Sequence, residues 1–311
     1  MHQAHTEAIA PSGAVTADAW GVVKAYVGLT KPRIIELLLV TTIPAMFLAA
    51  DGLPPLGLAL ATFVGGTASA ASANVFNSVL DADIDQHMRR TRRRPMPRHL
   101  VDPRAAYSFA VVLGLASLLL LGFGANWLSA GLSLVAILYY VFVYTLWLKR
   151  RTPQNIVWGG VAGCFPPLIG WTAVTGSIAV APLVLFAIVF FWTPPHTWAL
   201  GLRYREDYAR VDVPMLPVVA DAVTVTRQIL VYSVLTVATT MALWPTAGTG
   251  WLYPAVAALC GAWLLVEAVR LHRRARAGLR DSALNPMRLF HWSNSYLALV
   301  FIAAAVDPLL F

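Results

Sequence analysis

The feature that most limits how this chain can fold is a series of nine apolar stretches, each long enough to cross a lipid bilayer. A membrane-spanning helix needs about 20 largely apolar residues. The stretches are residues 34–50, 56–80, 104–122, 127–147, 155–174, 180–201, 224–244, 251–270 and 290–310. Only 12% of the 311 residues are charged, against about a quarter in soluble domains. We therefore predict an all-α integral membrane protein built as a single bundle of nine transmembrane helices.

The connections between these stretches alternate in length and charge. The short ones, 51–55, 123–126, 175–179 and 245–250, contain no Lys or Arg, whereas 81–103, 148–154, 202–223 and 271–289 are longer and basic. Allowing for helix ends, all 23 Lys and Arg fall on one side of the bundle. Cytoplasmic connections carry such an excess. We predict a multi-pass protein of the cell (inner) membrane, with its N-terminus in the cytoplasm and its C-terminus outside.

This orientation explains the net charge of +8, so the partner it requires is membrane lipid, and we expect no nucleic acid. Cys164 and Cys260 lie far apart in apolar stretches and are interpreted as small hydrophobic residues. The start of the chain is Ala-rich and lacks the pattern of a secretory signal. We expect residues 1–28 to form a disordered cytoplasmic tail and residues 29–311 a transmembrane domain.

Three of the stretches have unusual interiors. The run Gly65–Ala73 consists of small residues, which either permit close helix packing or line a cavity for a bulky ligand. Paired prolines at 166–167 and 194–195 interrupt the fifth and sixth stretches. Each pair removes helical hydrogen bonds, so we expect kinks there.

The main candidate site is the segment from Asn74 to Arg98, where an apolar stretch runs into a block of arginines. Asn77, Asp81 and Asp85 recur every fourth residue and share one face of a helix. Carboxylates that recruit Mg²⁺, next to arginines that bind phosphate, indicate a diphosphate site. The alternative is a solvated helix end, in which the acids merely balance the arginines.

A second acidic cluster lies between Leu202 and Val219 on the same side. It contains Glu206, Asp207 and Asp212 together with Arg203, Arg205 and Arg210. Such mixed charge is common in surface loops. Two acidic clusters that faced each other would hold Mg²⁺ ions bridging diphosphate oxygens.

Two further sets of residues have both a functional and a structural interpretation. Lys149, Lys31 and Arg33 either bind phosphate or anchor helix ends on the cytoplasmic side, and anchoring is favoured for Arg150 and Arg151. His196, after the second proline pair and between Trp192 and Trp198, is either a packing residue or part of a pocket for a flat aromatic acceptor.

Together these motifs resemble the UbiA-type intramembrane prenyltransferases, and within them the branch that farnesylates heme. The resemblance covers nearly the whole chain from Leu29. It rests on LTKPR at 29–33, the N-x-x-x-D-x-D-x-D pattern of 77–85 followed by MRRTRRRP, YTLWLKRRTPQNIVWGG, TPPHTWAL at 193–200 and DYARVDVPMLPVV at 207–219.

The resemblance implies a helical bundle with a central cavity that opens to the cytoplasmic side. It implies transfer of a farnesyl group from farnesyl diphosphate to a vinyl group of heme b, with addition of water, assisted by Mg²⁺. Heme A synthase is the implied recipient of the product. The implied roles are catalysis for Asn77, Asp81, Asp85 and Asp207; metal binding for Asp81, Asp85, Asp207 and Asp212; diphosphate binding for Arg93, Arg94, Lys149, Arg33 and Arg203; and acceptor binding for His196, Trp192 and Trp198.

The second acidic cluster departs from the superfamily's D-x-x-x-D pattern, because Asp212 follows Asp207 by five residues and Glu206 is an alternative ligand. Three other functions remain open at this level. One is prenylation of a quinone precursor or another aromatic ring by a member of the same superfamily. Another is transport of an anionic substrate, which the grouping of charges at one face disfavours. A heme-binding assembly protein would leave the acidic clusters without a role.

Overall fold

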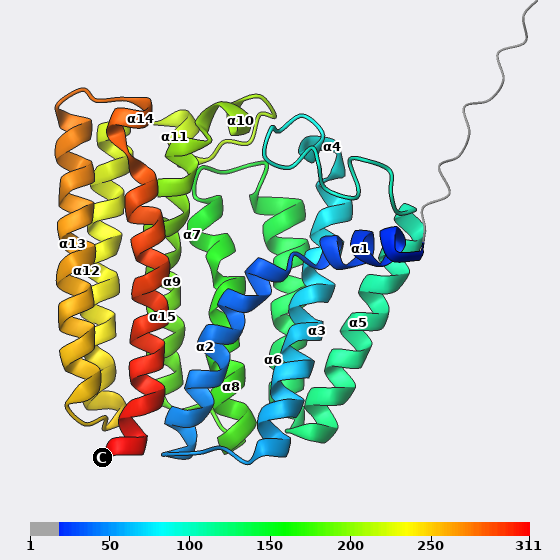
Figure 1. The fold of residues 1–311 in the computed structure, drawn as a ribbon, viewed down its shortest axis with the longest axis vertical. Coiled ribbons are helices and arrows are strands. Elements are labelled where there is room, and N and C mark those ends of the chain that lie inside the picture. Colours follow the sequence, from blue (N-terminus) through cyan, green and yellow to red (C-terminus); the bar gives the residue numbers. More distant parts are fainter. Residues whose placement is uncertain (1–18) are drawn as a thin grey trace, which may run out of the picture.

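The computed structural model describes residues 19–311, and within that range the chain is built from helices packed into one bundle (Figure 1). Nine helical segments are long and apolar enough to cross a membrane. They are α2 (Pro32–Ala50), α3 (Leu56–Leu80), α5 (Pro103–Gly124), α6 with η1 (Trp127–Leu148), α7 to α8 (Asn155–Thr175), α9 (Val180–Arg203), α12 (Ala222–Ala247), α13 (Leu252–Arg276) and α15 (Pro286–Leu310). The predicted all-α membrane bundle is confirmed.

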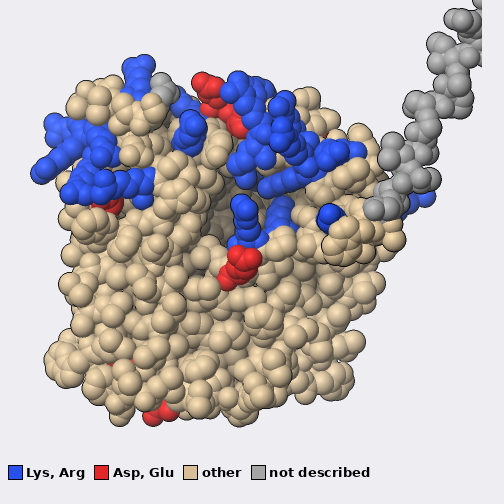
Figure 2. Space-filling model, in the orientation of Figure 1, with Lys and Arg blue, Asp and Glu red and all other residues tan. Residues whose placement is uncertain are grey.

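The two ends of the bundle differ in their connections. The short helices α4 (Ala82–Asp85), α10 (Arg205–Ala209), α11 (Leu216–Val219) and α14 (Asp281–Leu284) all lie at one end, and the C-terminus lies at the other (Figure 1). Figure 2 shows Lys and Arg gathered at the end with the short helices, where a recess opens among them. The alternation of loop charge in the sequence therefore corresponds to two physically distinct ends.

The helix α1 (Ala19–Thr30) lies across the charged end of the bundle (Figure 1). The sequence analysis assigned residues 19–28 to a disordered tail, whereas here they are helical, because Ala25 and Leu29 are buried among the residues that surround Val75 of α3. Trp20, Val23 and Val27 remain exposed. Residues 1–18 of the predicted tail lie outside the described residues.

One face of the small-residue run in α3 serves helix packing. A Cβ on Gly65 would lie 2.8 Å from the Cγ of Leu121 in α5, so glycine is needed for the two helices to approach. Two helical turns further along α3, the Ser72 hydroxyl donates to the Ala110 carbonyl of α5 at 2.7 Å. The packing interpretation of this run therefore holds for the face turned to α5.

The paired prolines have different effects on their two spans. The fifth span is divided into α7 (Asn155–Gly159), the 3₁₀ segment η2 (Gly160–Cys164) and α8 (Phe165–Thr175). Pro166 and Pro167 stand in the first turn of α8, where proline is tolerated because no amide donor is lost. The helix α9 instead runs as one α-helix through Pro194 and Pro195.

At the end of the bundle opposite the Lys and Arg residues, a buried carboxylate of one span binds the start of another span. Asp307, in the last turns of α15, is 1% exposed and accepts hydrogen bonds from the backbone amides of Gly250 and Tyr253, the latter at 2.8 Å. These amides stand at the start of α13, where helical N–H groups have no partner within the helix. Asp307 thus caps one helix from another.

We predict that Asp307→Ala lowers the free energy of unfolding by about 1–3 kcal/mol, because it leaves buried amide donors unpaired. The measurement is the thermal unfolding midpoint of the purified protein in detergent. Asp307→Asn keeps one acceptor oxygen and serves as the graded control, with a smaller decrease. An unchanged midpoint for Asp307→Ala would contradict the capping role.

Candidate active site

The first acidic motif lies where α3 ends at the charged end of the bundle. The Asn77 amide donates to Asp81 Oδ2 at 2.7 Å and to Thr145 Oγ1 of η1 at 3.1 Å. The helical path continues into α4, since the Asp85 amide donates to the Asp81 carbonyl at 2.8 Å. Asn77, Asp81 and Asp85 are 4%, 1% and 2% exposed. The four-residue spacing therefore brings three polar side chains into the interior.

Each of these buried groups has a basic partner. Lys149 Nζ lies 2.5 Å from Asp81 Oδ2, and Arg94 Nη1 lies 2.7 Å from Asp85 Oδ2. The Lys31 ammonium donates to Asn77 Oδ1. Burial of an ionised carboxylate is costly unless it is paired, so these cations are what allow the acids to stand inside the bundle. Of the predicted diphosphate-binding residues, Lys149 and Arg94 lie in this network.

Lys31, whose pattern in the sequence is compatible with phosphate binding or with helix anchoring, lies in this network, whereas the predicted phosphate ligand Arg33 is exposed. Its backbone is left-handed, with φ 54°. The preceding turn is fixed to α3, because Asn74 donates to the Thr30 carbonyl at 2.9 Å and Ser78 to the Leu29 carbonyl at 3.2 Å. Burial, assisted by the nearby Arg94 charge, lowers the pKa of Lys31 to about 7.

The signal that identifies Lys31 in the sequence is its position directly before Pro32. A proline favours the first turn of a helix, so Pro32 marks the start of the first span. The residue before it then lies at the same membrane boundary as the end of the second span, where Asp81 stands.

The second acidic motif contributes one buried carboxylate, Asp207 of α10, which is 4% exposed. It accepts a hydrogen bond from the Arg90 backbone amide at 3.3 Å and lies 3.5 Å from Arg210 Nη1. The Arg90 guanidinium donates to the Tyr208 hydroxyl at 3.4 Å and lies over the Tyr204 ring at 5.9 Å. Arg90 therefore joins the segment after α4 to the α9–α10 connection, so the two motifs are brought to one place.

Burial separates these acids from the other acidic candidates. Asp83, Glu206 and Asp212 are exposed, and Asp212 has a left-handed backbone in a turn. Asp83 forms a paired hydrogen bond with Arg150, with both distances 2.7 Å, and this bond lowers the pKa of Asp83. The predicted phosphate ligands Arg33, Arg93 and Arg203 are also exposed. None of these exposed candidates has a described contact with Asn77, Asp81 or Asp85. Arg150 links the two sets, because it pairs with Asp83 and also lies 4.0 Å from Asp81 Oδ1.

The donor set fits Mg²⁺. Within residues 19–311, no three His, Cys, Asp or Glu side chains are close enough to hold a metal ion by themselves. Mg²⁺ is usually bound by one or two carboxylates together with substrate phosphate oxygens, so a third protein ligand is not required. Asp81 Oδ1 is buried and accepts no hydrogen bond among the described residues, and Arg150 Nη2 is 4.0 Å away. This carboxylate oxygen is therefore available to a further cation.

The position of Lys149 depends on an unusual helix. The segment η1 (Tyr139–Leu148) is a π-helix, in which the Lys149 amide donates to the Tyr144 carbonyl five residues back at 2.9 Å. The Thr145 hydroxyl donates to the Tyr140 carbonyl at 2.8 Å and also accepts from Asn77. Single π turns are frequent at functional sites. Here the π-helix supplies both the lysine that pairs with Asp81 and the threonine that holds Asn77.

An apolar cavity of about 160 Å³ lies among α2, α3, η1, η2 and α8. On α3 it is lined by Gly66, Ser69, Ala70, Ala73 and Asn74. These positions share the helix face that continues to Asn77 and Asp81, one turn after another. The small-residue run therefore serves both interpretations: one face packs against α5 and the other lines a cavity that leads toward the acidic motif.

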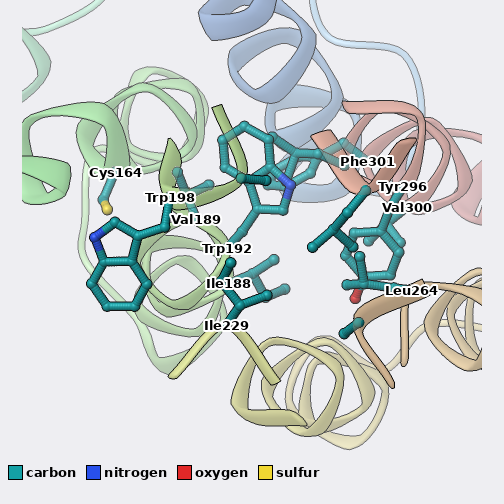
Figure 3. Close-up of a cluster of buried hydrophobic side chains, with 14 of the residues drawn as sticks. Cys164, Ile188, Val189, Trp192, Trp198, Ile229, Leu264, Tyr296, Val300 and Phe301 are labelled. Atoms are coloured by element: carbon teal, nitrogen blue, oxygen red, sulfur yellow. The ribbon is translucent and has the colours of Figure 1, made fainter. Parts of the chain in front are cut away.

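The predicted acceptor residues lie in helix packing. The His196 ring is stacked between Trp192, at 4.3 Å between centroids, and Phe290 of α15, at 4.4 Å. His196 Nδ1 bonds Ser293 Oγ at 2.8 Å, and Trp192 Nε1 donates to the Ser293 carbonyl at 2.7 Å. The Trp198 ring packs edge-on against Tyr232 of α12, with 5.5 Å between the ring centroids, and is directed away from Trp192 (Figure 3). These contacts are those of packing residues, and an acceptor role for the three stays a prediction.

Comparison with known proteins decides the family. The profile of the UbiA prenyltransferase family matches residues 38–294. The chain belongs to this family. The expected enzyme class, a transferase that moves a prenyl group, is confirmed, and the assignment decides against a transporter.

UbiA family members with curated names match this chain over nearly its whole length. A protoheme IX farnesyltransferase of Cutibacterium acnes is 66% identical over 93% of this chain and 86% of its own length. One of Nocardioides sp. is 62% identical over 96% and 95%. Among solved structures, one from work on digeranylgeranylglyceryl phosphate synthase has a TM-score of 0.76 at 17% identity, covering 93% of this chain and 99% of its own.

A solved UbiA homolog from Archaeoglobus fulgidus, bound to DMAPP and Mg²⁺, has a TM-score of 0.63 at 14% identity and covers 91% of this chain and 99% of its own. At these identities both solved structures support the fold alone.

The lowered pKa of Lys31 predicts a pH dependence of stability. Its pKa is about 7 in the fold and about 10.4 in an unfolded chain, so between these values the unfolded state binds more protons and this group makes the fold more stable as pH rises. We expect the thermal unfolding midpoint of the wild type to rise relative to Lys31→Met between pH 6 and 9. The control is Arg33→Met, whose difference from wild type should not change with pH. A constant Lys31→Met difference would refute the shift.

Proposed function

We propose that this protein transfers a farnesyl group from farnesyl diphosphate to a vinyl group of heme b. The observation that carries the proposal is the pairing of the buried Asp81 and Asp85 with the partly buried Lys149 and Arg94, beside Lys31, at the end of an apolar cavity. A prenyl diphosphate has a matching division, with a charged head and an apolar tail. The heme acceptor is supported by the relatives named protoheme IX farnesyltransferase, which are 54–66% identical to this chain.

The basic residues act on the diphosphate. Lys149, Arg94 and Lys31 surround the position of the diphosphate, so that charge developing on the leaving group meets preorganised cations in a site of low dielectric. Asp81, with one of the other two buried carboxylates (Asp85 or Asp207), would hold Mg²⁺ together with diphosphate oxygens, and the ion would neutralise part of the diphosphate charge. Asn77 positions Asp81 through its amide and receives Lys31 on its carbonyl oxygen.

The bond changes balance without a redox partner. The allylic C–O bond of farnesyl diphosphate breaks, and the diphosphate leaves with the electron pair. The vinyl π electrons of heme b form the new C–C bond to the farnesyl carbon. A water oxygen then bonds the other vinyl carbon and loses a proton. The apolar cavity around the chain keeps other water from the reacting carbon.

The same proposal gives the protein its orientation. The charged end, with the diphosphate site, faces the cytoplasm of a cell (inner) membrane, since the basic connections gather there (Figure 2). Farnesyl diphosphate, a soluble anion, then reaches the basic recess from water, and its tail enters the cavity. Heme A synthase is the proposed recipient of the hydroxyethylfarnesyl product.

The deciding experiment is an assay of the purified protein with heme b, farnesyl diphosphate and Mg²⁺, read by the mass of the porphyrin product. We expect a product heavier by one farnesyl group and one hydroxyl group, formed only when Mg²⁺ is present. A quinone precursor offered with the same diphosphate tests the alternative acceptor. Turnover of the quinone precursor and not of heme would overturn the proposal.

A pair of neighbouring aspartates tests the site itself. We expect Asp81→Asn to lower kcat about 10²–10³-fold, the range for loss of one transition-state contact, with the protein still folded at the assay temperature. Asp83→Asn is the matched control, because Asp83 is exposed and pairs with Arg150, and it should keep near wild-type kcat. Equal activity of the two variants would remove Asp81 from the catalytic machinery.

A further inference from the structure

The apolar cavity has a depth that can be estimated from two of its walls. On α3, the deepest lining residue is Gly66, eleven residues before Asn77, which at 1.5 Å per residue is ~16 Å along the helix. On α2, the deepest is Thr42, eleven residues after Lys31, again ~16 Å. Lys31 and Asn77 contact each other. The two distances therefore start at the same contact, and the α2 and α3 walls of the cavity reach the same depth from it.

The cavity ends there because two helices meet. A Cβ on Gly170 of α8 would lie 2.2 Å from the Thr42 carbonyl oxygen, so only glycine permits this approach of α8 to α2. The Thr42 hydroxyl donates to the Leu38 carbonyl at 2.9 Å and is satisfied within its own helix. Ile169, next to Gly170, lines the cavity. The floor is thus a backbone contact that a flexible chain cannot push aside.

This depth corresponds to a particular chain length. The three backbone bonds between successive Cα atoms span about 3.8 Å, so an isoprene unit of four bonds extends about 5 Å. Three units extend ~15 Å by the same geometry, close to the distance from the Lys31–Asn77 contact to the floor.

We propose that the face of α3 from Ala73 through Ala70 to Gly66 is a ruler that selects a prenyl chain of three isoprene units. The proposal rests on the proposed function, since it assumes that this cavity holds the prenyl chain. Ala73, Ala70 and Gly66 stand four, seven and eleven residues before Asn77, ~6, ~10 and ~16 Å along the helix. An extended prenyl chain that starts at the Lys31–Asn77 contact would therefore end its first, second and third isoprene units near Ala73, Ala70 and Gly66, respectively.

Gly66 is the position at which the ruler can be changed with least damage to the fold. A Cβ built there has no atom within 4 Å, so a larger side chain enters the cavity and displaces nothing. The next residue on the chain differs, because Gly65 faces Leu121 at 2.8 Å. Two adjacent glycines thus have opposite tolerance, which is expected if one faces a ligand and the other a helix.

The test compares geranyl, farnesyl and geranylgeranyl diphosphates in direct competition, with heme b and Mg²⁺, in wild type, Gly66→Leu and Ala70→Leu. We expect wild type to prefer farnesyl. In Gly66→Leu the ratio of kcat/KM for farnesyl over geranyl should fall about tenfold or more, since even one methylene group is discriminated by about 10- to 200-fold in an apolar pocket. It should fall further in Ala70→Leu, which blocks the cavity nearer the diphosphate.

Gly57→Leu is the matched control. Gly57 lies on the same helix, is exposed, and also has open space around a built Cβ, but it does not line the cavity. Its chain-length ratio should equal that of the wild type. An unchanged ratio in Gly66→Leu and Ala70→Leu would overturn the ruler.

A second measurement separates this proposal from the proposed function. Binding of the three diphosphates with Mg²⁺, without acceptor, is followed by the shift of the unfolding midpoint. If wild type binds farnesyl diphosphate but does not alkylate heme, the proposed acceptor fails while the ruler is still tested by the binding order of the variants. If the variants bind the three chains in the wild-type order, the ruler fails while the proposed function stands.

Discussion

The pairing of buried acids with partly buried lysine and arginine at one end of the bundle is the interaction on which the rest of the structure depends. Asp81 and Asp85 are almost fully buried at the edge of a membrane domain, where an unpaired carboxylate would be protonated or would unfold its surroundings. Lys149 and Arg94 prevent this. The cations come from η1 and from the segment after α4, so the ion pairs also fix how the spans meet at that end.

The network is not electrically complete in the protein alone. One oxygen of Asp81 remains without a hydrogen bond, and Lys31 has a pKa near 7 because it is buried beside other cations. A ligand with several negative oxygens and its metal ion would resolve both conditions at once, since the anion favours a charged Lys31 and the metal engages the free oxygen. Both features are those expected of the diphosphate site proposed above.

The fold was readable from the sequence because hydropathy and loop charge are local properties. The nine predicted stretches agree with the nine spans to within a few residues, and the four-residue spacing correctly put Asn77 and Asp81 on one face. What the sequence did not decide is which of two neighbouring charged residues is buried. Lys31 lies inside and Arg33 outside, because α1 is tied to α3 by hydrogen bonds between distant residues.

The aromatic residues around His196 also show that a local sequence pattern does not identify the partners of a side chain. A histidine between two tryptophans, after a proline pair, has the composition of a ligand pocket, yet the His196 ring is enclosed by Trp192 and Phe290. Phe290 and Ser293 come from a helix almost one hundred residues later in the chain. No local pattern in α9 indicates that this helix is its neighbour. The sequence therefore predicts the kinds of residue at the site better than it predicts their partners.

The π-helix makes the site sensitive to the register of the chain in a way that apolar composition does not reveal. In an α-helix each residue turns the chain by about 100°, so loss of one residue between Tyr140 and Leu148 would swing Lys149 away from Asp81 and leave that carboxylate with no lysine. The number of residues in η1 therefore matters to the site independently of their apolar character.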